Sequence, residues 1–142
     1  MHPKNVNVIQ SADIDCCILA NNHVADWGFP GLTETMDTLR NAGIKFAGAG
    51  RNSSEATSPA VFQLEDDTRV LVSSAGHYSS GVPDSWQAKP DREGVNILEF
   101  YQASKAVTQL KEQIKQHKQD GDIIIFPSTG VETGALMLIL PL

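Results

Sequence analysis

The sequence predicts an α/β protein in which a mixed sheet is flanked by helices. Short apolar runs typical of buried strands alternate with segments whose apolar residues recur at helical spacing. One strand, helix and strand follow each other closely enough to form a parallel βαβ crossover. Two later strands are joined by a short polar turn, which predicts an antiparallel pair. Parallel and antiparallel pairs in one chain indicate a mixed sheet.

The βαβ unit lies in the first third of the chain. The apolar run 14–20 predicts the first strand, residues 30–42 the helix, and residues 44–48 the second strand. Pro30 suits the first turn of the helix, where its missing amide hydrogen is not needed. Glycine at position 43 is a typical stop signal. The apolar stripe of the helix consists of Leu32, Met36 and Leu39.

The other expected elements have simpler signals. In chain order they are a helix over 3–12, a turn over 48–52, a short helix from residue 53, strands over 60–64 and 69–73, a loop over 76–96, a helix over 102–119 with Val107, Leu110 and Ile114 on one stripe, and a strand over 122–126. A loop as long as 76–96 is often functional.

Composition narrows the function classes. The chain has 142 residues, which suits one domain or part of one, and a formal net charge of −6. That charge argues against a general nucleic-acid or anionic-membrane surface. No signal peptide opens the chain and no apolar stretch approaches a bilayer span, so we expect a cytoplasmic protein without a membrane segment, unless a signal precedes Met1. The adjacent Cys16 and Cys17 would face opposite sides of a strand, which predicts two buried thiols rather than a disulfide.

The most informative stretch is residues 20–28, ANNHVADWG, directly after the first predicted strand. It places Asn22, His23 and Asp26 at the carboxyl end of that strand, where α/β sheets hold their ligands. An amide oxygen can bind a hard metal ion, and a histidine can give a proton to a leaving oxygen. The alternative is structural: Asn21 and Asn22 would form the strand exit, and Asp26 would cap the next helix. Spacing alone leaves the two readings about even.

For the other tryptophan and histidine residues considered, we expect structural roles or none. Trp27 is expected to pack over the helix start, which is more common than serving as a substrate platform. His77 lies in the long loop, from which it could reach a site, but a loop histidine without a partner is expected to be solvated. His117 is expected to pack on the second long helix or to complement its dipole.

Several separated motifs resemble one family. The resemblance covers about residues 15–99, and its motifs occur in the order of the family: residues 20–28, 31–32, 35–39, 48–52, 55–56, Pro59, 80–83, Trp86 and 94–96. The family is that of capsule and poly-γ-glutamate synthesis (CapA) proteins, a branch of the calcineurin-like metallophosphatase superfamily. The resemblance implies part of a metallophosphatase-like sandwich of two sheets with helices outside.

The resemblance also implies roles for individual residues. Asn22 corresponds to an asparagine that binds one of two metal ions, and His23 to a histidine that contacts phosphate and protonates the leaving group. Asp26 would orient His23, and Asn21 and Trp27 would line the site. The metal pair expected for the intact family is Mn, Fe or Zn, and it would polarise the phosphoryl oxygen.

Other parts of the family pattern are absent. No strand carrying a Gly-Asp motif precedes residue 14, and the closing Gly-His-x-His motif is missing. A later His-Trp-Gly-x-Glu motif corresponds to residues 128–132, where Ser128 stands for the metal-binding histidine and Thr129 for the tryptophan, while Glu132 matches. We therefore expect residues 1–142 to form one partial domain that lacks the N-terminal strands and C-terminal motifs. A catalytic metal usually takes about three protein ligands, so this chain alone is expected to bind no metal tightly.

Three functions stay open at this point. The first is a CapA-like protein of capsule polysaccharide or poly-γ-glutamate biosynthesis, with a metal-dependent phosphoesterase-type site that is incomplete in this chain. The second is a non-catalytic accessory or binding module in anionic polymer synthesis, and the third an inert truncated gene product. The expected substrate contains phosphate or relates to an anionic polymer, and no nucleic acid is expected. An uncovered sheet face makes self-association possible. The apolar tail 136–142 would either add a strand on that face or be the product of a shifted reading frame.

Overall fold

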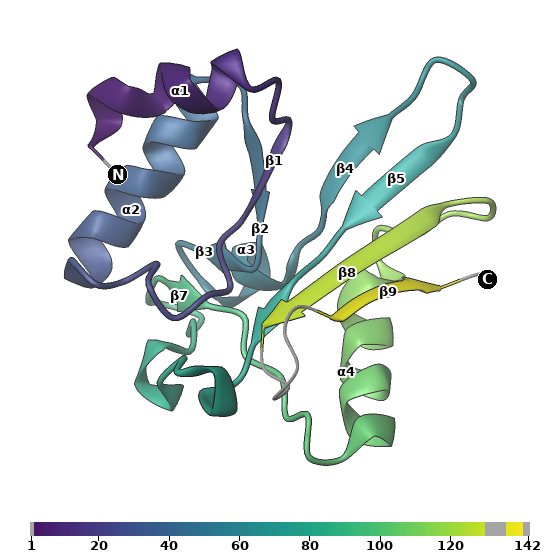
Figure 1. Ribbon diagram of the computed structural model, residues 1–142. Helices are drawn as coiled ribbons and strands as arrows, with labels where there is room; N and C mark the ends of the chain where they lie inside the picture. Colours follow the sequence, from purple (N-terminus) through teal and green to yellow (C-terminus); the bar gives the residue numbers. More distant parts are fainter. Residues whose placement is uncertain (1, 130–135, 141–142) are drawn as a thin grey trace.

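The computed structural model describes residues 2–129 and 136–140, and it confirms the α/β class with helices and mixed sheets (Figure 1). The helices are α1 (Val6–Ser11), α2 (Gly28–Asn41), α3 (Ser53–Thr57) and α4 (Ala103–Lys115), with short 3-10 turns η1 (Pro3–Asn5), η2 (Tyr78–Ser80) and η3 (Asp84–Trp86). The strands are β1 (Cys16–Ile18), β2 (Lys45–Ala47), β3 (Ala49–Gly50), β4 (Ala60–Gln63), β5 (Arg69–Val72), β6 (Ala75–Gly76), β7 (Gly94–Val95), β8 (Ile123–Thr129) and β9 (Leu136–Leu140).

The predicted βαβ unit is confirmed. β1 and β2 pair in parallel, with Cys16 opposite Lys45, and α2 connects them. The predicted stripe of α2 is buried, since Leu32, Met36 and Leu39 are each at most 3% exposed. They pack with residues of β1, β2 and α1 in one apolar cluster, which fixes the strand ends relative to the helix.

The larger sheet is mixed, as predicted. β4 and β5 form the expected antiparallel hairpin, and β8 pairs in parallel with both β5 and β6, which follow each other in the chain. α4 lies beside this sheet in Figure 1. Its Leu110 and Ile114 pack against Leu71, Ile124 and Phe126 of the strands, and this contact forms the second main core.

The second long helix is shorter than predicted. α4 ends at Lys115, because residues 116–120 form a turn in which the Asp122 carboxylate accepts the amide hydrogen of Gln119 at 2.7 Å. The buried stripe is Ala106, Leu110 and Ile114, so the prediction that Val107 faces the core is wrong; that residue is 39% exposed. None of the helices in the described ranges is long and apolar enough to cross a membrane.

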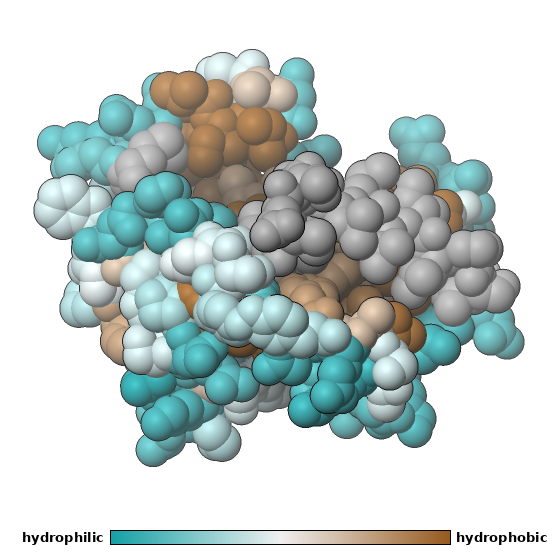
Figure 2. Space-filling view, turned by 60° about the horizontal axis from the view of Figure 1, so that its bottom comes forward, coloured by the Kyte–Doolittle hydropathy of each residue, from teal (hydrophilic) through white to brown (hydrophobic). Residues whose placement is uncertain are grey.

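Two predicted irregular segments contain short paired strands. The turn 48–52 includes β3, which pairs with β7 from the loop 76–96. β6 also begins at the edge of that loop and pairs with β8. The apolar tail adds β9 antiparallel to β8, so the expected extra strand joins the sheet by pairing within it rather than by covering its face. Figure 2 shows one side of the molecule, where hydrophilic side chains dominate and apolar ones gather in patches.

The two cysteines are free and half-buried, less deeply than predicted. They face opposite sides of β1 as expected, since Cys16 packs in the cluster with Ala60 and Val72 and Cys17 in the cluster with Leu32. Burial raises the pKa of the Cys16 thiol to about 11, with a smaller contribution from the neighbouring Cys17. At neutral pH Cys16 is therefore a protonated, weakly reactive thiol.

Candidate functional site

The loop that leaves β1 is organised by Asn21. Its amide oxygen accepts the backbone hydrogen of His23 at 3.0 Å, and its amide nitrogen donates to the carbonyl of Ile18 at 3.2 Å. An asparagine that bonds its own backbone two residues on is a common turn device. Asn21 therefore shapes the strand exit and sets the position from which His23 projects.

His23 and Asp26 form a hydrogen-bonded pair on this loop. Nδ1 of the imidazole lies 3.0 Å from Oδ2 of the carboxylate, and the two side chains are 76% and 49% exposed. The structural alternative expected Asp26 to cap α2, but it does not. The N-cap residue is Trp27, whose side chain makes no capping bond. The carboxylate instead fixes the imidazole, so that Nε2 is the nitrogen on the side away from Asp26.

Asn22 is exposed and lies against the loop that follows β6. A Cβ atom on Gly81 would be 3.3 Å from both Cβ and Nδ2 of Asn22, and Gly81 has a φ of +80°. The exit of β1 and the segment after β6 therefore meet at this point. A side chain at position 81 would press on the amide that the family resemblance assigns to a metal ion.

Gly48 joins the end of β2 to the same region. Its φ is +90°, and a Cβ atom there would lie 2.6 Å from Cβ of Ala20 and 3.1 Å from Cβ of Ser74. Only glycine fits this close approach without displacing its neighbours. The carboxyl ends of β1, β2 and β5 thus come together around one residue without a side chain.

The carboxyl end of β8 reaches this edge as well. In the parallel register Ser128 lies opposite Ala75, and Thr129 lies opposite Gly76, just before His77. Position 128, where the resemblance expects a histidine, is therefore at a strand end, as a site residue would be. Glu132, the other predicted residue of that motif, lies outside the described residues.

His77 is buried, so the prediction that it is solvated is wrong. Its side chain is 3% exposed; Nδ1 accepts the amide hydrogen of Ser79 at 3.2 Å, and Nε2 lies 3.2 Å from Oε1 of Glu99. Three aromatic rings surround the imidazole with centroids 4.4–5.8 Å away: Tyr78, Phe100 and Tyr101. Glu99 is distant in sequence, so local pattern gave no signal for this contact.

Trp27 also differs from its predicted packing role. It is 87% exposed, the largest exposure among the large hydrophobic residues that lie on the described surface. Its position at the N-cap of α2 holds it outside the helix stripe that enters the core. The structure therefore places it beside Asp26 on the same surface loop.

The donor set of this loop does not complete a metal site. In the described ranges, no group of three or more His, Cys, Asp or Glu residues is arranged to hold a metal ion. Asn22 supplies one neutral amide, whereas catalytic metal ions usually have about three protein ligands. What the loop itself provides is an oriented imidazole beside an exposed amide.

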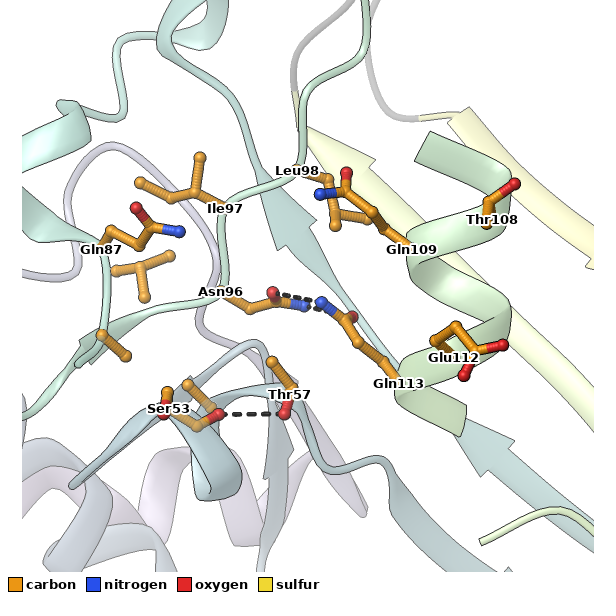
Figure 3. A pocket seen from close by; sticks show the side chains of 13 residues that line it. Ser53, Thr57, Gln87, Asn96, Ile97, Leu98, Thr108, Gln109, Glu112 and Gln113 are labelled. Carbon is orange, nitrogen blue, oxygen red and sulfur yellow. Dashed lines mark hydrogen bonds between the residues drawn. The ribbon is translucent and has the colours of Figure 1, made fainter. Parts of the chain in front are cut away.

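A separate cleft lies between α3, β7 and α4 and has a volume of about 340 Å³. Figure 3 shows the side chains of Asn96 and Gln113 meeting across it, where each amide donates to the other at 3.0 Å. Asn96 also donates to the carbonyl of Ser74 at 2.9 Å. This cleft contains none of the residues predicted for the site, and the amide pair serves to hold α4 against the strand ends.

Comparison with known proteins agrees with the resemblance seen in the sequence. The model of a family described as bacterial capsule synthesis protein matches residues 1–135. A protein of Mycobacterium tuberculosis strain H37Rv, named "Probable polyglutamine synthesis accessory protein", is 38% identical over 125 residues. The match covers 88% of this chain and 33% of that protein, and a protein of the same name from strain CDC 1551 gives the same values.

A more distant relative is an uncharacterized protein of Sinorhizobium fredii. It is 26% identical over 127 residues, a match that covers 81% of this chain and 28% of that protein. The chain thus spans about a third of the length of the curated relatives it matches.

Proposed function

The chain belongs to the bacterial capsule synthesis family, and from this premise we propose that it carries one corner of a metal-dependent phosphoesterase-type site used in capsule polysaccharide or poly-γ-glutamate biosynthesis. Asn22 would bind metal, His23 would be the general acid, and Asp26 would position His23. The remaining ligands would come from outside the described residues. Because the relatives are about three times longer, the activity is proposed for the whole protein.

The observation that carries this proposal is the His23–Asp26 pair. A solvent-exposed polar pair such as His23 and Asp26 contributes little to stability, so we assign this oriented pair on a loop a functional role. With Nδ1 bonded to Asp26, a protonated imidazole presents Nε2–H to an incoming phosphoester. Nε2–H would first donate a hydrogen bond to a phosphate oxygen and then give its proton to the leaving oxygen.

The metal ions proposed for the intact site are Mn, Fe or Zn in a pair. When bound, they would polarise the phosphoryl oxygen and supply hydroxide near neutral pH. Since the described donors fall short of a metal site, the role derived for this chain is confined to the proton transfer by His23. The proposed substrate is a phosphate-containing compound related to an anionic polymer.

A second candidate is a non-catalytic accessory role in polymer synthesis. The name of the mycobacterial relative, which calls it an accessory protein, favours this role. In that case residues 20–26 would be a surface turn, and the protein would bind the polymer or the enzyme that makes it. Pull-down of the polymer or of a membrane ligase by the chain would support this role, and failure of both would count against it.

Hydrolysis of bis(p-nitrophenyl) phosphate tests the first candidate. We expect slow hydrolysis above the buffer rate when millimolar Mn²⁺ is supplied, because mass action can fill a weak site. The assay follows p-nitrophenolate absorbance with and without Mn²⁺. Hydrolysis that stays at the buffer rate at every Mn²⁺ concentration would reject a phosphoesterase role for this chain and leave the accessory role.

A further inference from the structure

A pocket beside Trp27 lies between the start of η1 and the first two turns of α2. It has a volume of about 400 Å³ and is lined by His2, Pro3, Trp27, Gly31, Glu34 and Thr35. This volume lies within the range of small-ligand sites, which run from about 300 to 1,000 Å³. The pocket shares Trp27 with the loop of the candidate site, but none of Asn22, His23 and Asp26 lines it.

Trp27 offers this pocket an open aromatic wall. The side chain is 87% exposed. A buried aromatic residue is explained by its contribution to the stability of the fold, whereas a large exposed one is not and therefore points to a ligand. Gly31 keeps this arrangement possible. A Cβ atom there would lie 2.7 Å from Cβ of Trp27 and would push the indole from its place.

The polar groups in the pocket include both donors and acceptors. Nδ1 of His2 accepts the backbone hydrogen of Lys4 at 3.2 Å, which leaves Nε2 as the ring nitrogen that donates. Thr35 donates its hydroxyl hydrogen to the carbonyl of Gly31 at 2.8 Å, which leaves its oxygen as an acceptor. The carboxylate of Glu34 is a second, stronger acceptor.

The charge of the pocket selects against anions. None of the described residues that line it is Lys or Arg, and Glu34 is the only carboxylate among them. The whole chain has a formal charge of −6. A phosphate group or a polyglutamate segment would therefore be repelled here.

We propose that this pocket binds the neutral ring of a saccharide, with Trp27 stacked on the ring face and Glu34, Thr35 and His2 bonding its hydroxyls. The weakly polar C–H face of a sugar ring suits the electron-rich face of an indole. Each hydroxyl both donates and accepts, which matches the mixed set of groups in the pocket. A quaternary ammonium ion without oxygen atoms, such as tetramethylammonium, could also stack on Trp27, but it has no acceptor for the Nε2–H of His2.

Nuclear magnetic resonance of the unaltered chain tests the proposal through the indole N–H signal of Trp27. That signal is the one missing from the spectrum of Trp27→Phe, since the chain has two tryptophans. Three neutral trisaccharides are tested one at a time: maltotriose, triacetylchitotriose and galactotriose. We expect at least one of them to shift the Trp27 signal, with a midpoint at a ligand concentration of about 1 mM. No shift with any of the three, or a shift with tetramethylammonium or short poly-γ-glutamate instead, would overturn the proposal.

Variants distinguish specific binding in this pocket from nonspecific binding to exposed aromatic side chains. Trp27→Ala is expected to abolish saccharide binding in equilibrium dialysis, and Glu34→Gln to weaken it by about 3- to 10-fold through loss of a charged hydrogen bond. Tyr101→Ala is the matched control, because Tyr101 is also exposed, at 67%, but does not line the pocket. Equal loss of binding in Tyr101→Ala and Trp27→Ala would contradict a specific site. The readout is binding of a neutral sugar, so it does not depend on phosphoester hydrolysis by His23.

Discussion

His23→Ala is expected to reduce Mn²⁺-dependent hydrolysis of bis(p-nitrophenyl) phosphate to the buffer rate. General acid catalysis by a positioned side chain typically contributes about 100-fold or more, and this chain has little rate to lose. His23 is 76% exposed and belongs to none of the four hydrophobic clusters of the described residues, so its removal should leave the fold intact. The measurement is the initial rate at saturating Mn²⁺, with circular dichroism to confirm folding.

Two further variants make the His23 result specific. Asp26→Asn keeps the size of the side chain but can donate to Nδ1, which would favour the wrong tautomer, so we expect an intermediate loss of rate. His117→Ala removes a half-buried histidine just past the C-terminal end of α4 and should leave the rate unchanged. A rate that His23→Ala does not alter would show that the hydrolysis comes from another group or from free metal.

Gly48→Ala is expected to destabilise the protein by about 3 kcal/mol, of which about 1–2 is left-handed backbone strain and the rest overpacking. Gly48 has a φ of +90°, and a Cβ atom would lie 2.6 Å from Cβ of Ala20. The clash involves the segment directly before Asn21, so the strand exit would move as well. Urea denaturation measures the change in the free energy of unfolding.

Gly43 provides the matched control for Gly48. Its φ is +75°, but a Cβ atom there would have no atom within 4 Å among the described residues apart from Gly43 itself and its two chain neighbours. Gly43→Ala should therefore cost only the backbone strain, about 1 kcal/mol. Equal destabilisation by the two substitutions would mean that the close contact of Gly48 with Ala20 and Ser74 does not affect the free energy of unfolding, which would contradict this prediction.

The sequence predicted the elements whose signals are local. The α2 stripe and the β4–β5 hairpin follow from periodicity over a few residues, and the structure has both. The strand pair β3–β7 was missed, because two-residue strands show no alternation and their partners are distant in the chain. α4 was predicted too long because the turn after Lys115 depends on a hydrogen bond from Gln119 to Asp122.

The candidate site shows the same limit. Residues 20–26 were found because they are contiguous and follow a strand. The contact of Asn22 with Gly81 and the burial of His77 against Glu99 depend on tertiary structure, which no single-sequence pattern reports. The exposure of Trp27 was also missed, since a tryptophan at a helix start more often packs than faces solvent.

Calorimetric titration of Mn²⁺ or Zn²⁺ into the chain tests most directly whether residues 20–26 form only one corner of a metal site. One exposed amide ligand, Asn22, is too few to hold tightly a metal ion that normally needs about three ligands. The expected result is binding no tighter than about 1 mM, weakened further by Asn22→Ala. Micromolar binding that Asn22→Ala or His23→Ala abolishes would show that this chain completes the site by itself and would contradict the account.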